Sequence, residues 1–133
     1  VMIGQSDAGA HKGYDARFGY STAFLGRWVR DHGIMSLEDA VNKLTFRVAS
    51  IFGLGDRGLL RPGLAADVAV FDPATVNTLE PEYVQDLPGN ETRMIQKAAG
   101  VPHTIVNGQI VIENGAPTGA FPGKVLRPSA WGK

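Results

Sequence analysis

The sequence of 133 residues predicts an α/β protein, and three features support that class. A short apolar run over residues 1–5 is expected to form a buried strand. Two segments with helical spacing of apolar side chains follow, at residues 18–33 and 36–53. The rest of the chain carries β-branched runs bounded by turn residues. The expected order is therefore a strand, two helices and then further strands.

The segment 18–33 is predicted to be an amphipathic helix. Its apolar face consists of Tyr20, Phe24, Leu25, Trp28 and Val29. Charged side chains take the other face. His32 followed by Gly33 is a typical helix end, because a cation suits the negative pole of the helix dipole and glycine adopts left-handed backbone. Since Trp28 belongs to the apolar face, we expect it in the core.

The segment 36–53 is predicted to be the second helical region. Ser36 is a good N-cap, and acidic residues in the following turn suit the positive pole of the dipole. The apolar stripe consists of Leu37, Val41, Leu44 and Val48. Thr45 and the β-branched residues after it are expected to divide the segment into two shorter helices.

The second half of the chain is predicted to be mainly β-structure. Residues 67–72 contain an apolar run that is bounded by Asp67 and by Asp72-Pro73, as expected for a strand. Residues 74–100 are polar and contain prolines, so an irregular excursion is expected there. Residues 103–113 carry two β-branched runs around Asn107-Gly108, the pair that favours a type I′ hairpin turn.

Composition excludes several classes of function. Thirteen basic residues balance 13 acidic ones without a basic cluster, which argues against nucleic acid as a partner. The chain has no cysteine, so it has no disulfide framework or thiolate metal site, and we expect a cytoplasmic protein. No apolar run approaches the roughly 20 residues of a membrane span. The chain begins with Val1, which suggests that the natural N-terminus lies upstream.

Asp7 is the first candidate for a functional residue. It lies in "SDAGAH", a stretch of small residues directly after the predicted first strand. In parallel α/β folds, functional groups gather at the C-terminal ends of strands, where the loops surround one cavity. Taken alone, however, an Asp in such a loop is more often a turn former or a helix cap.

Three stretches together resemble the C-terminal part of the amidohydrolase superfamily. They are "SDAGAH", "LGRWVRDHGIMSLEDAVNKLTFRVASIFGLGDRGLLRPGLAADVAVFDP" and "VNGQIVIENGAPTGAFPGKVLR". The part "LRPGLAADVAVFDP" is also similar to sequences of dihydroorotase-like and cytosine-deaminase-like proteins, so by itself it indicates only a metal-dependent amidohydrolase. "SDAGAH" with the long match after it narrows the resemblance to the N-acyl-D-amino-acid deacylase branch, which contains the D-aminoacylase-like enzymes.

The resemblance implies a (β/α)8 TIM barrel joined to a small β-sandwich domain that is built from both chain ends. Residues 1–54 would be the end of the barrel, with residues 1–5 as its eighth strand. Residues 55–133 would be the C-terminal part of the β-sandwich, with the irregular excursion at about 74–100. A whole barrel takes roughly 250 residues, so most of it would precede this sequence.

The resemblance also implies a divalent metal, typically zinc, and gives Asp7 a role beside it. In the family, the metal activates a water molecule and polarises the amide carbonyl. Asp7 matches the carboxylate that is both a metal neighbour and the proton shuttle. The family's other ligands, including a His-x-His pair, are not in this sequence. A catalytic zinc generally needs three protein ligands, so we expect the intact parent to hold zinc and this chain alone to be metal-free and inactive.

The other polar candidates have weaker support. His11 follows Asp7 in the same loop, and it either contacts the substrate carboxylate, orients Asp7, or bonds only to the backbone. His103 is expected on a strand surface. Arg57 and Arg61 are expected to hold turns, and Asp67 to bond backbone at the start of a strand.

The favoured hypothesis is thus the C-terminal part of a metal-dependent hydrolase that cleaves the amide bond of N-acyl-D-amino acids. Its expected partner is that small-molecule substrate. Two alternatives are a related cyclic-amide hydrolase of the dihydroorotase or hydantoinase kind and a non-catalytic interaction module. A His-x-His pair in the upstream coding sequence would favour an enzyme over the module.

Overall fold

The computed structural model describes residues 19–127. The predicted strand over residues 1–5 and the loop over residues 6–17 lie outside the described residues. The described chain forms two compact units, one from residues 19–35 with 73–100 and the other from residues 36–72 with 101–127. Helices and strands occur in both, which agrees with the predicted mixed class. The boundary expected between residues 54 and 55 stays a prediction.

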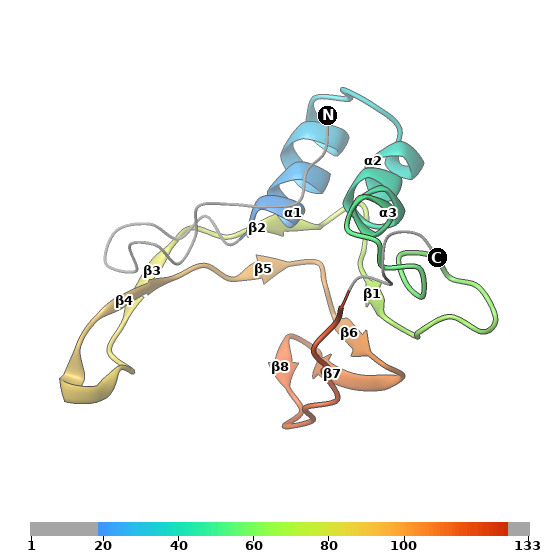
Figure 1. Cartoon of the computed structure of the whole chain (residues 1–133). Coiled ribbons are helices and arrows are strands. Elements are labelled where there is room, and N and C mark those ends of the chain that lie inside the picture. Colours follow the sequence, from blue (N-terminus) through green and yellow to red (C-terminus); the bar gives the residue numbers. More distant parts are fainter. Residues whose placement is uncertain (1–18, 128–133) are drawn as a thin grey trace. The chain divides into compact units, whose positions relative to one another are not determined.

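The first unit begins with one continuous helical segment, coloured blue in Figure 1. The α-helix α1, Tyr20–Ala23, passes directly into the π-helix η2, Phe24–Asp31. At its end, the His32 N–H donates to the carbonyl of Arg27, five residues back, at 3.1 Å. Gly33 then takes a positive φ of 60°, and its N–H donates to the Val29 carbonyl at 3.0 Å. The predicted helix and its Gly33 end are confirmed.

Trp28 is not in the core as expected, since its side chain remains 47% exposed. Phe24, Leu25 and Val29 are buried. The cause is the π-helical winding, which the α-helical spacing did not anticipate. Because each turn of a π-helix takes more residues than a turn of an α-helix, Trp28 lies at the edge of the buried face and not at its centre.

Where the sequence predicted an irregular excursion, the structure has a paired antiparallel ribbon (Figure 1, yellow to gold). Strand β2, Asn77–Thr78, pairs with β5, Ala98–Ala99. Further out, β3, Glu82–Val84, pairs with β4, Arg93–Ile95, and the 3-10 turn η3, Pro88–Asn90, lies between these two strands. Each strand has only two or three residues, which is too short for an alternating pattern to be recognised in the sequence.

Ion pairs join the two sides of this ribbon. The Arg93 guanidinium donates to both carboxylate oxygens of Asp86, at 2.6 and 2.7 Å. The Lys97 ammonium lies 2.5 Å from a carboxylate oxygen of Glu82. Arg93 lowers the pKa of Asp86, chiefly through this hydrogen bonding. The side chains of both pairs are partly or largely exposed, so the pairs contribute little to the stability of the fold.

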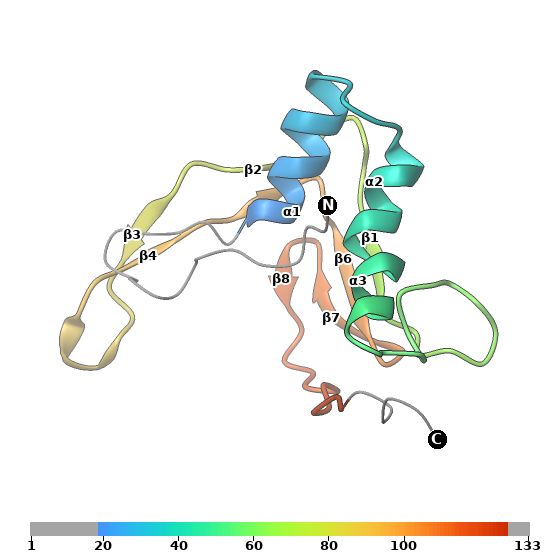
Figure 2. The ribbon, with the colours of Figure 1, turned by 45° about the horizontal axis from the view of Figure 1, so that its top comes forward.

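The helical segment packs closely on β2 in the same unit (Figure 2). Gly26 lies against the backbone of Val76 and Asn77, and the Val76 side chain is 1% exposed. The Arg30 guanidinium donates to the carbonyls of Ala74 and Val76, at 3.2 and 2.8 Å. A small residue on the helix and an arginine at its end thus hold the start of the ribbon.

The second unit opens with the helix pair that the sequence predicted. Helix α2 is Leu37–Leu44 and helix α3 is Phe46–Ile51. The Ser36 hydroxyl accepts a hydrogen bond from the Asp39 N–H at 3.1 Å, which confirms the N-cap. Thr45, with φ −118° and ψ −92°, separates the helices, and its hydroxyl donates to the Val41 carbonyl at 2.7 Å.

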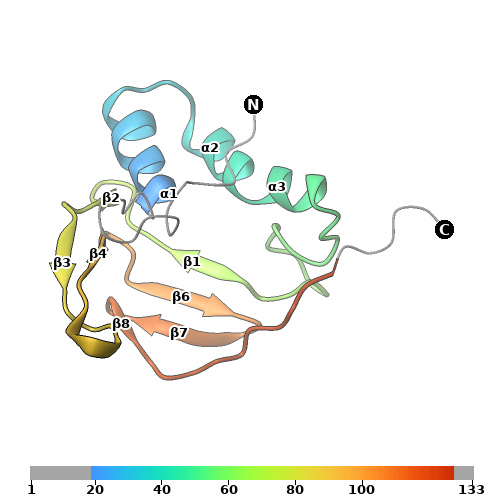
Figure 3. The same ribbon diagram turned by 60° about the vertical axis from the view of Figure 1, so that its left-hand side comes forward.

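A four-stranded antiparallel sheet forms the rest of this unit (Figure 3). Its strands, in spatial order, are β1 (Val68–Val70), β6 (His103–Val106), β7 (Gln109–Glu113) and β8 (Ala116–Pro117). The β6–β7 turn has positive φ at both Asn107 (47°) and Gly108 (80°), so the predicted type I′ turn is confirmed. A second Asn-Gly turn leads into β8. This strand could not be recognised in the sequence, because it has only two residues and one of them is a proline.

Large side chains remain exposed in both units. They include Tyr83, Phe52 and Phe121. In the second unit the buried apolar residues among those described are Ala40 and Ala49, on the two helices. Within residues 19–127, no helix is both long and apolar enough to cross a membrane.

The packing of Gly26 on Val76 predicts the effect of Gly26→Ala. A Cβ at this position would overlap the Val76 carbonyl oxygen, which belongs to the backbone and cannot move aside cheaply. Overpacking of this kind costs about 1–3 kcal/mol. A better helix propensity returns up to about 1 kcal/mol. We therefore expect a lower free energy of unfolding, measured by urea denaturation followed by circular dichroism.

Gly55→Ala is the matched control, because a Cβ there would meet nothing within 4 Å and its backbone φ is not positive. It should leave the urea midpoint nearly unchanged. Equal midpoints for the two variants would contradict the close packing of the helix on β2.

Candidate functional site

The two residues of the predicted site, Asp7 and His11, lie outside the described residues. Their roles in metal contact, proton transfer and substrate binding stay predictions. The other polar candidates, which are His32, His103, Arg57, Arg61 and Asp67, lie within the described residues.

Metal binding is the first chemistry to consider. Across residues 19–127, no three His, Cys, Asp or Glu side chains gather closely enough to hold a metal ion. A metal bound by this protein would therefore need ligands from outside this range.

His32 lies at the exposed end of η2. Its ring centroid is 5.3 Å from that of Trp28, and the planes are tilted by 39°. The Arg27 guanidinium lies 5.7 Å from the Trp28 ring centroid, in a cation–π contact. His32 and Arg27 thus cover part of the exposed tryptophan. His32 has no neighbouring side chains among the described residues with which it could bind a metal ion.

His103 starts strand β6, opposite Val70 of β1 and Glu113 of β7. The sequence placed it on a strand surface, and the structure shows it on a strand with its side chain half-buried. Its Nδ1 is buried and has no hydrogen-bond partner among the described residues. The Cα pairing with Glu113 brings these residues opposite each other, but no hydrogen bond joins them.

Asp67 joins two separate segments of the second unit. One of its carboxylate oxygens accepts a hydrogen bond from the Asn107 backbone N–H at 2.8 Å. The other is paired with the Arg57 guanidinium. Arg57 also donates to both carboxylate oxygens of Asp56, at 3.0 and 3.1 Å, and its side chain is only 12% exposed. The structural roles predicted for Arg57 and Asp67 are confirmed.

The charges in this cluster stabilise one another. Hydrogen bonding from Arg57 lowers the pKa of Asp56, and Asp56 and Asp67 together raise the pKa of Arg57. A lowered carboxyl pKa adds stability that is present at neutral pH and is lost only as the pH falls through the acidic range. The Arg57–Asp56 contact is therefore expected to keep its charges at neutral pH.

Further hydrogen bonds fix the β6–β7 turn. The Gly108 N–H donates to the Ala66 carbonyl at 2.9 Å, and the Asn107 side-chain amide donates to the Pro122 carbonyl at 2.8 Å. Sequence analysis recognised Asn107 as a turn residue and missed both contacts. Their partners are separated along the chain, so no local pattern could have indicated them.

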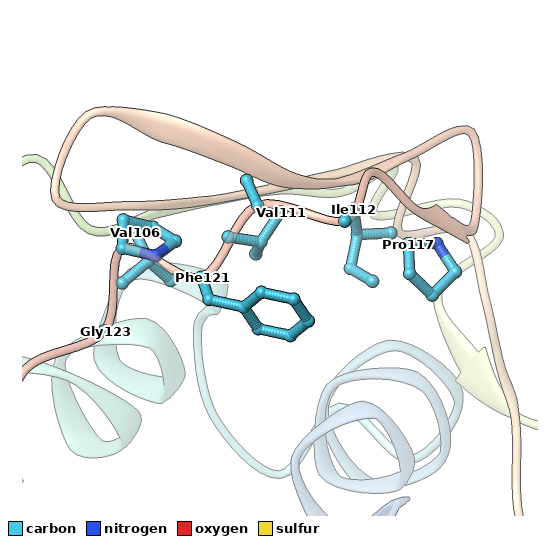
Figure 4. A pocket seen from close by; sticks show the side chains of 9 residues that line it. Val106, Val111, Ile112, Pro117, Phe121 and Gly123 are labelled. Carbon is cyan, nitrogen blue, oxygen red and sulfur yellow. The ribbon is translucent and has the colours of Figure 1, made fainter.

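The backbone carbonyl of Arg61 accepts the Leu64 N–H at 3.1 Å. This bond does not involve the guanidinium, so the structural role expected for the Arg61 side chain stays a prediction. An open groove of about 360 Å³ lies along β7 (Figure 4). Its lining is apolar and comprises Val106, Val111, Ile112, Pro117 and residues 119–123. Because no titratable side chain lines it, the groove has no group for acid–base chemistry.

Comparison with known proteins assigns the family. The sequence model of the amidohydrolase family matches residues 1–112. The chain belongs to the amidohydrolase family. The match includes "SDAGAH", so Asp7 and His11 lie in the region that matches the family, although they lie outside the residues that the structure describes.

Several relatives of this amidohydrolase chain are deacylases. An N-acyl-D-glutamate deacylase of Alcaligenes xylosoxydans xylosoxydans is 41% identical over 113 residues, which are 85% of this chain and 21% of that protein. A solved structure of D-aminoacylase, described as having a binuclear metal centre, matches with a TM-score of 0.66 and 38% identity, over 83% of this chain and 21% of the other.

A second solved structure adds chemical information about a relative. It is an N-acyl-D-glutamate deacylase from Bordetella bronchiseptica, in complex with zinc and a phosphonate inhibitor that mimics the tetrahedral intermediate of the reaction. The TM-score is 0.55 at 36% identity, over 75% of this chain and 20% of the other. The chain thus spans about a fifth of the length of the relatives it matches.

The contacts of Asp67 predict the effect of Asp67→Ala. The change removes the acceptor of the Asn107 N–H and the partner of Arg57. Loss of a charge-assisted hydrogen bond costs roughly 1.5–3 kcal/mol. We expect a lower urea midpoint and faster hydrogen exchange of the Asn107 amide.

Asp56→Ala provides the comparison, because Asp56 contacts the same arginine and is 62% exposed. It should leave exchange of the Asn107 amide unchanged. Slow exchange of that amide in Asp67→Ala would show that the turn does not depend on the carboxylate.

Proposed function

We propose that the chain is the C-terminal part of a metal-dependent amidohydrolase that hydrolyses the amide bond of N-acyl-D-amino acids. The observation that carries this proposal is the family match from residue 1, which includes "SDAGAH" and therefore Asp7. The 41% identity to an N-acyl-D-glutamate deacylase supports the deacylase branch over other amidohydrolases.

The proposal gives each part of the chain a place in the whole enzyme. Residues 1–54 would complete a (β/α)8 barrel, and residues 55–133 would contribute to a small β-sandwich. The similarity to D-aminoacylase at a TM-score of 0.66 supports this placement. The α2–α3 pair and the four-stranded sheet would then belong to the scaffold, which agrees with the structural roles of Arg57 and Asp67.

Asp7 would have two roles in the reaction. A divalent metal such as zinc, when bound, supplies a Lewis acid that favours ionisation of water near neutral pH. The Asp7 carboxylate, as its neighbour, would accept a proton during attack of water on the amide carbonyl and deliver it to the leaving nitrogen. The products are a carboxylate and a free D-amino acid. The other metal ligands would come from elsewhere in the whole enzyme.

His11 would lie beside this site, four residues after Asp7. Two functional roles are compatible with that spacing, namely a contact to the carboxylate of the substrate and a hydrogen bond that orients Asp7. They differ kinetically, because the first acts on substrate affinity and the second on the chemical step. A histidine that bonds only to the backbone is the non-functional alternative.

Replacing Asp7 by Asn in the whole enzyme tests the central residue. The substitution keeps the size and removes both the charge and the proton acceptor. We expect kcat for an N-acetyl-D-amino acid to fall by about 10²–10⁴-fold, because the proton moves in the transition state. Metal content must be measured in parallel. A fully metallated Asp7→Asn enzyme with wild-type kcat would refute the proposed role.

The same kinetic assay with a cyclic amide such as dihydroorotate distinguishes an N-acyl-D-amino-acid deacylase from the alternative, a cyclic-amide hydrolase.

His11→Asn in the whole enzyme tests the role of His11. A higher KM with little change in kcat indicates contact with the substrate carboxylate, whereas a lower kcat indicates orientation of Asp7.

The metal requirement predicts the behaviour of the 133-residue chain itself. Catalytic zinc generally needs three protein ligands, and this sequence offers Asp7 as the residue that matches a family ligand. We expect the purified chain to bind zinc only weakly and to have no deacylase activity. Stoichiometric zinc that resists a chelator, detected by elemental analysis, would reveal a site that the proposal lacks.

A further inference from the structure

Two Asn-Gly pairs form neighbouring turns of the four-stranded sheet. Asn107-Gly108 joins β6 to β7, and Asn114-Gly115 joins β7 to β8. The φ angles are 47° and 80° in the first turn and 50° and 80° in the second. The two turns therefore have similar φ angles, and they differ in their hydrogen-bond contacts.

The first turn is held at every group that could react. The Asn107 side-chain amide donates to the Pro122 carbonyl at 2.8 Å, and the Gly108 N–H donates to the Ala66 carbonyl at 2.9 Å. The Asn107 N–H is bound by the Asp67 carboxylate at 2.8 Å. Any rearrangement of this turn must break these hydrogen bonds together.

The second turn has fewer and weaker contacts. Asn114 and Gly115 are exposed, and no described residue forms a hydrogen bond with the Asn114 side chain. The Gly115 N–H has a long hydrogen bond of 3.4 Å to the Pro102 carbonyl. Strand β8, which follows, has two exposed residues at the end of the strand order. Short edge strands of this kind open at low free-energy cost.

From this contrast we propose that Asn114 is a site of spontaneous deamidation, whereas Asn107 is protected. The Gly115 backbone nitrogen attacks Cγ of Asn114, the new C–N bond closes a succinimide ring, and the Cγ–Nδ2 bond breaks. The side-chain nitrogen leaves as ammonia and carries away the proton of the Gly115 N–H. Water then opens the ring at either carbonyl, which yields aspartate or isoaspartate. The reaction consumes one water and involves no oxidation.

The product changes the edge of the sheet. It places a negative charge beside Glu113, and the isoaspartate form lengthens the backbone of a two-residue turn by one methylene. The residues after β8 are still held, because the Thr118 N–H donates to the Val111 carbonyl at 3.0 Å and its hydroxyl donates to the Ile110 carbonyl at 2.7 Å. The disturbance is therefore confined to residues 114–117, and Pro117 is the member of the apolar groove that it reaches.

Peptide mapping of the full 133-residue chain tests the proposal. The chain is incubated in mildly alkaline buffer, with and without urea, and each asparagine is followed by mass spectrometry and by enzymatic methylation of isoaspartate. We expect Asn114 to convert at least about ten times faster than Asn107 in buffer, a ratio equivalent to about 1.4 kcal/mol. In urea the two rates should become similar. Asn114→Gln should abolish the fast conversion.

Asp67→Ala supplies a second readout. It should accelerate conversion of Asn107 several-fold and leave Asn114 unchanged, whereas Asp56→Ala should alter neither rate. Equal rates at the two asparagines of the wild-type chain in buffer would overturn the proposal. An Asn107 rate that does not respond to Asp67→Ala would overturn the assigned cause of its protection.

Discussion

The second unit depends on one half-buried polar contact, the Asp67 carboxylate shared between Arg57 and the Asn107 backbone. One oxygen reaches the turn of the β6–β7 hairpin and the other reaches the loop after α3. The contact therefore ties the beginning of β1 to segments ten and forty residues away in the sequence. A carboxylate suits this position because it accepts hydrogen bonds on both sides without needing a proton of its own.

Elements that depend on neighbouring residues could be predicted from the sequence. The Ser36 cap, the break at Thr45 and the turn at Asn107-Gly108 each follow from the backbone preferences of one or two residues. The ribbon over residues 77–99 could not be predicted in this way, because its strands are held by pairing with distant partners. The position of Trp28 was missed because the sequence does not indicate the π-helical winding.

The same distinction between features set by neighbouring residues and features set by distant ones applies to the candidate site. Local chemistry suggested only that Asp7 follows a strand, which is compatible with a turn former. Its interpretation as a catalytic carboxylate came from the resemblance of "SDAGAH" and the text after it to one branch of a family. A metal site needs ligands from several segments, and residues 19–127 do not bring such a set together. The described residues instead show that Arg57 and Asp67, which both lie in the stretch that resembles the family, are in contact with each other.

The ribbon has a consequence for how this protein behaves among other chains. A two-stranded ribbon leaves backbone donors and acceptors free along its outer edges, where a strand from another molecule could add. Here the strands are two or three residues long, Pro81 interrupts one side, and ion pairs such as Arg93–Asp86 place charges across it. Short strands, proline and charge are the features by which natural sheets discourage intermolecular pairing. The ribbon can thus extend from its unit without becoming a template for aggregation.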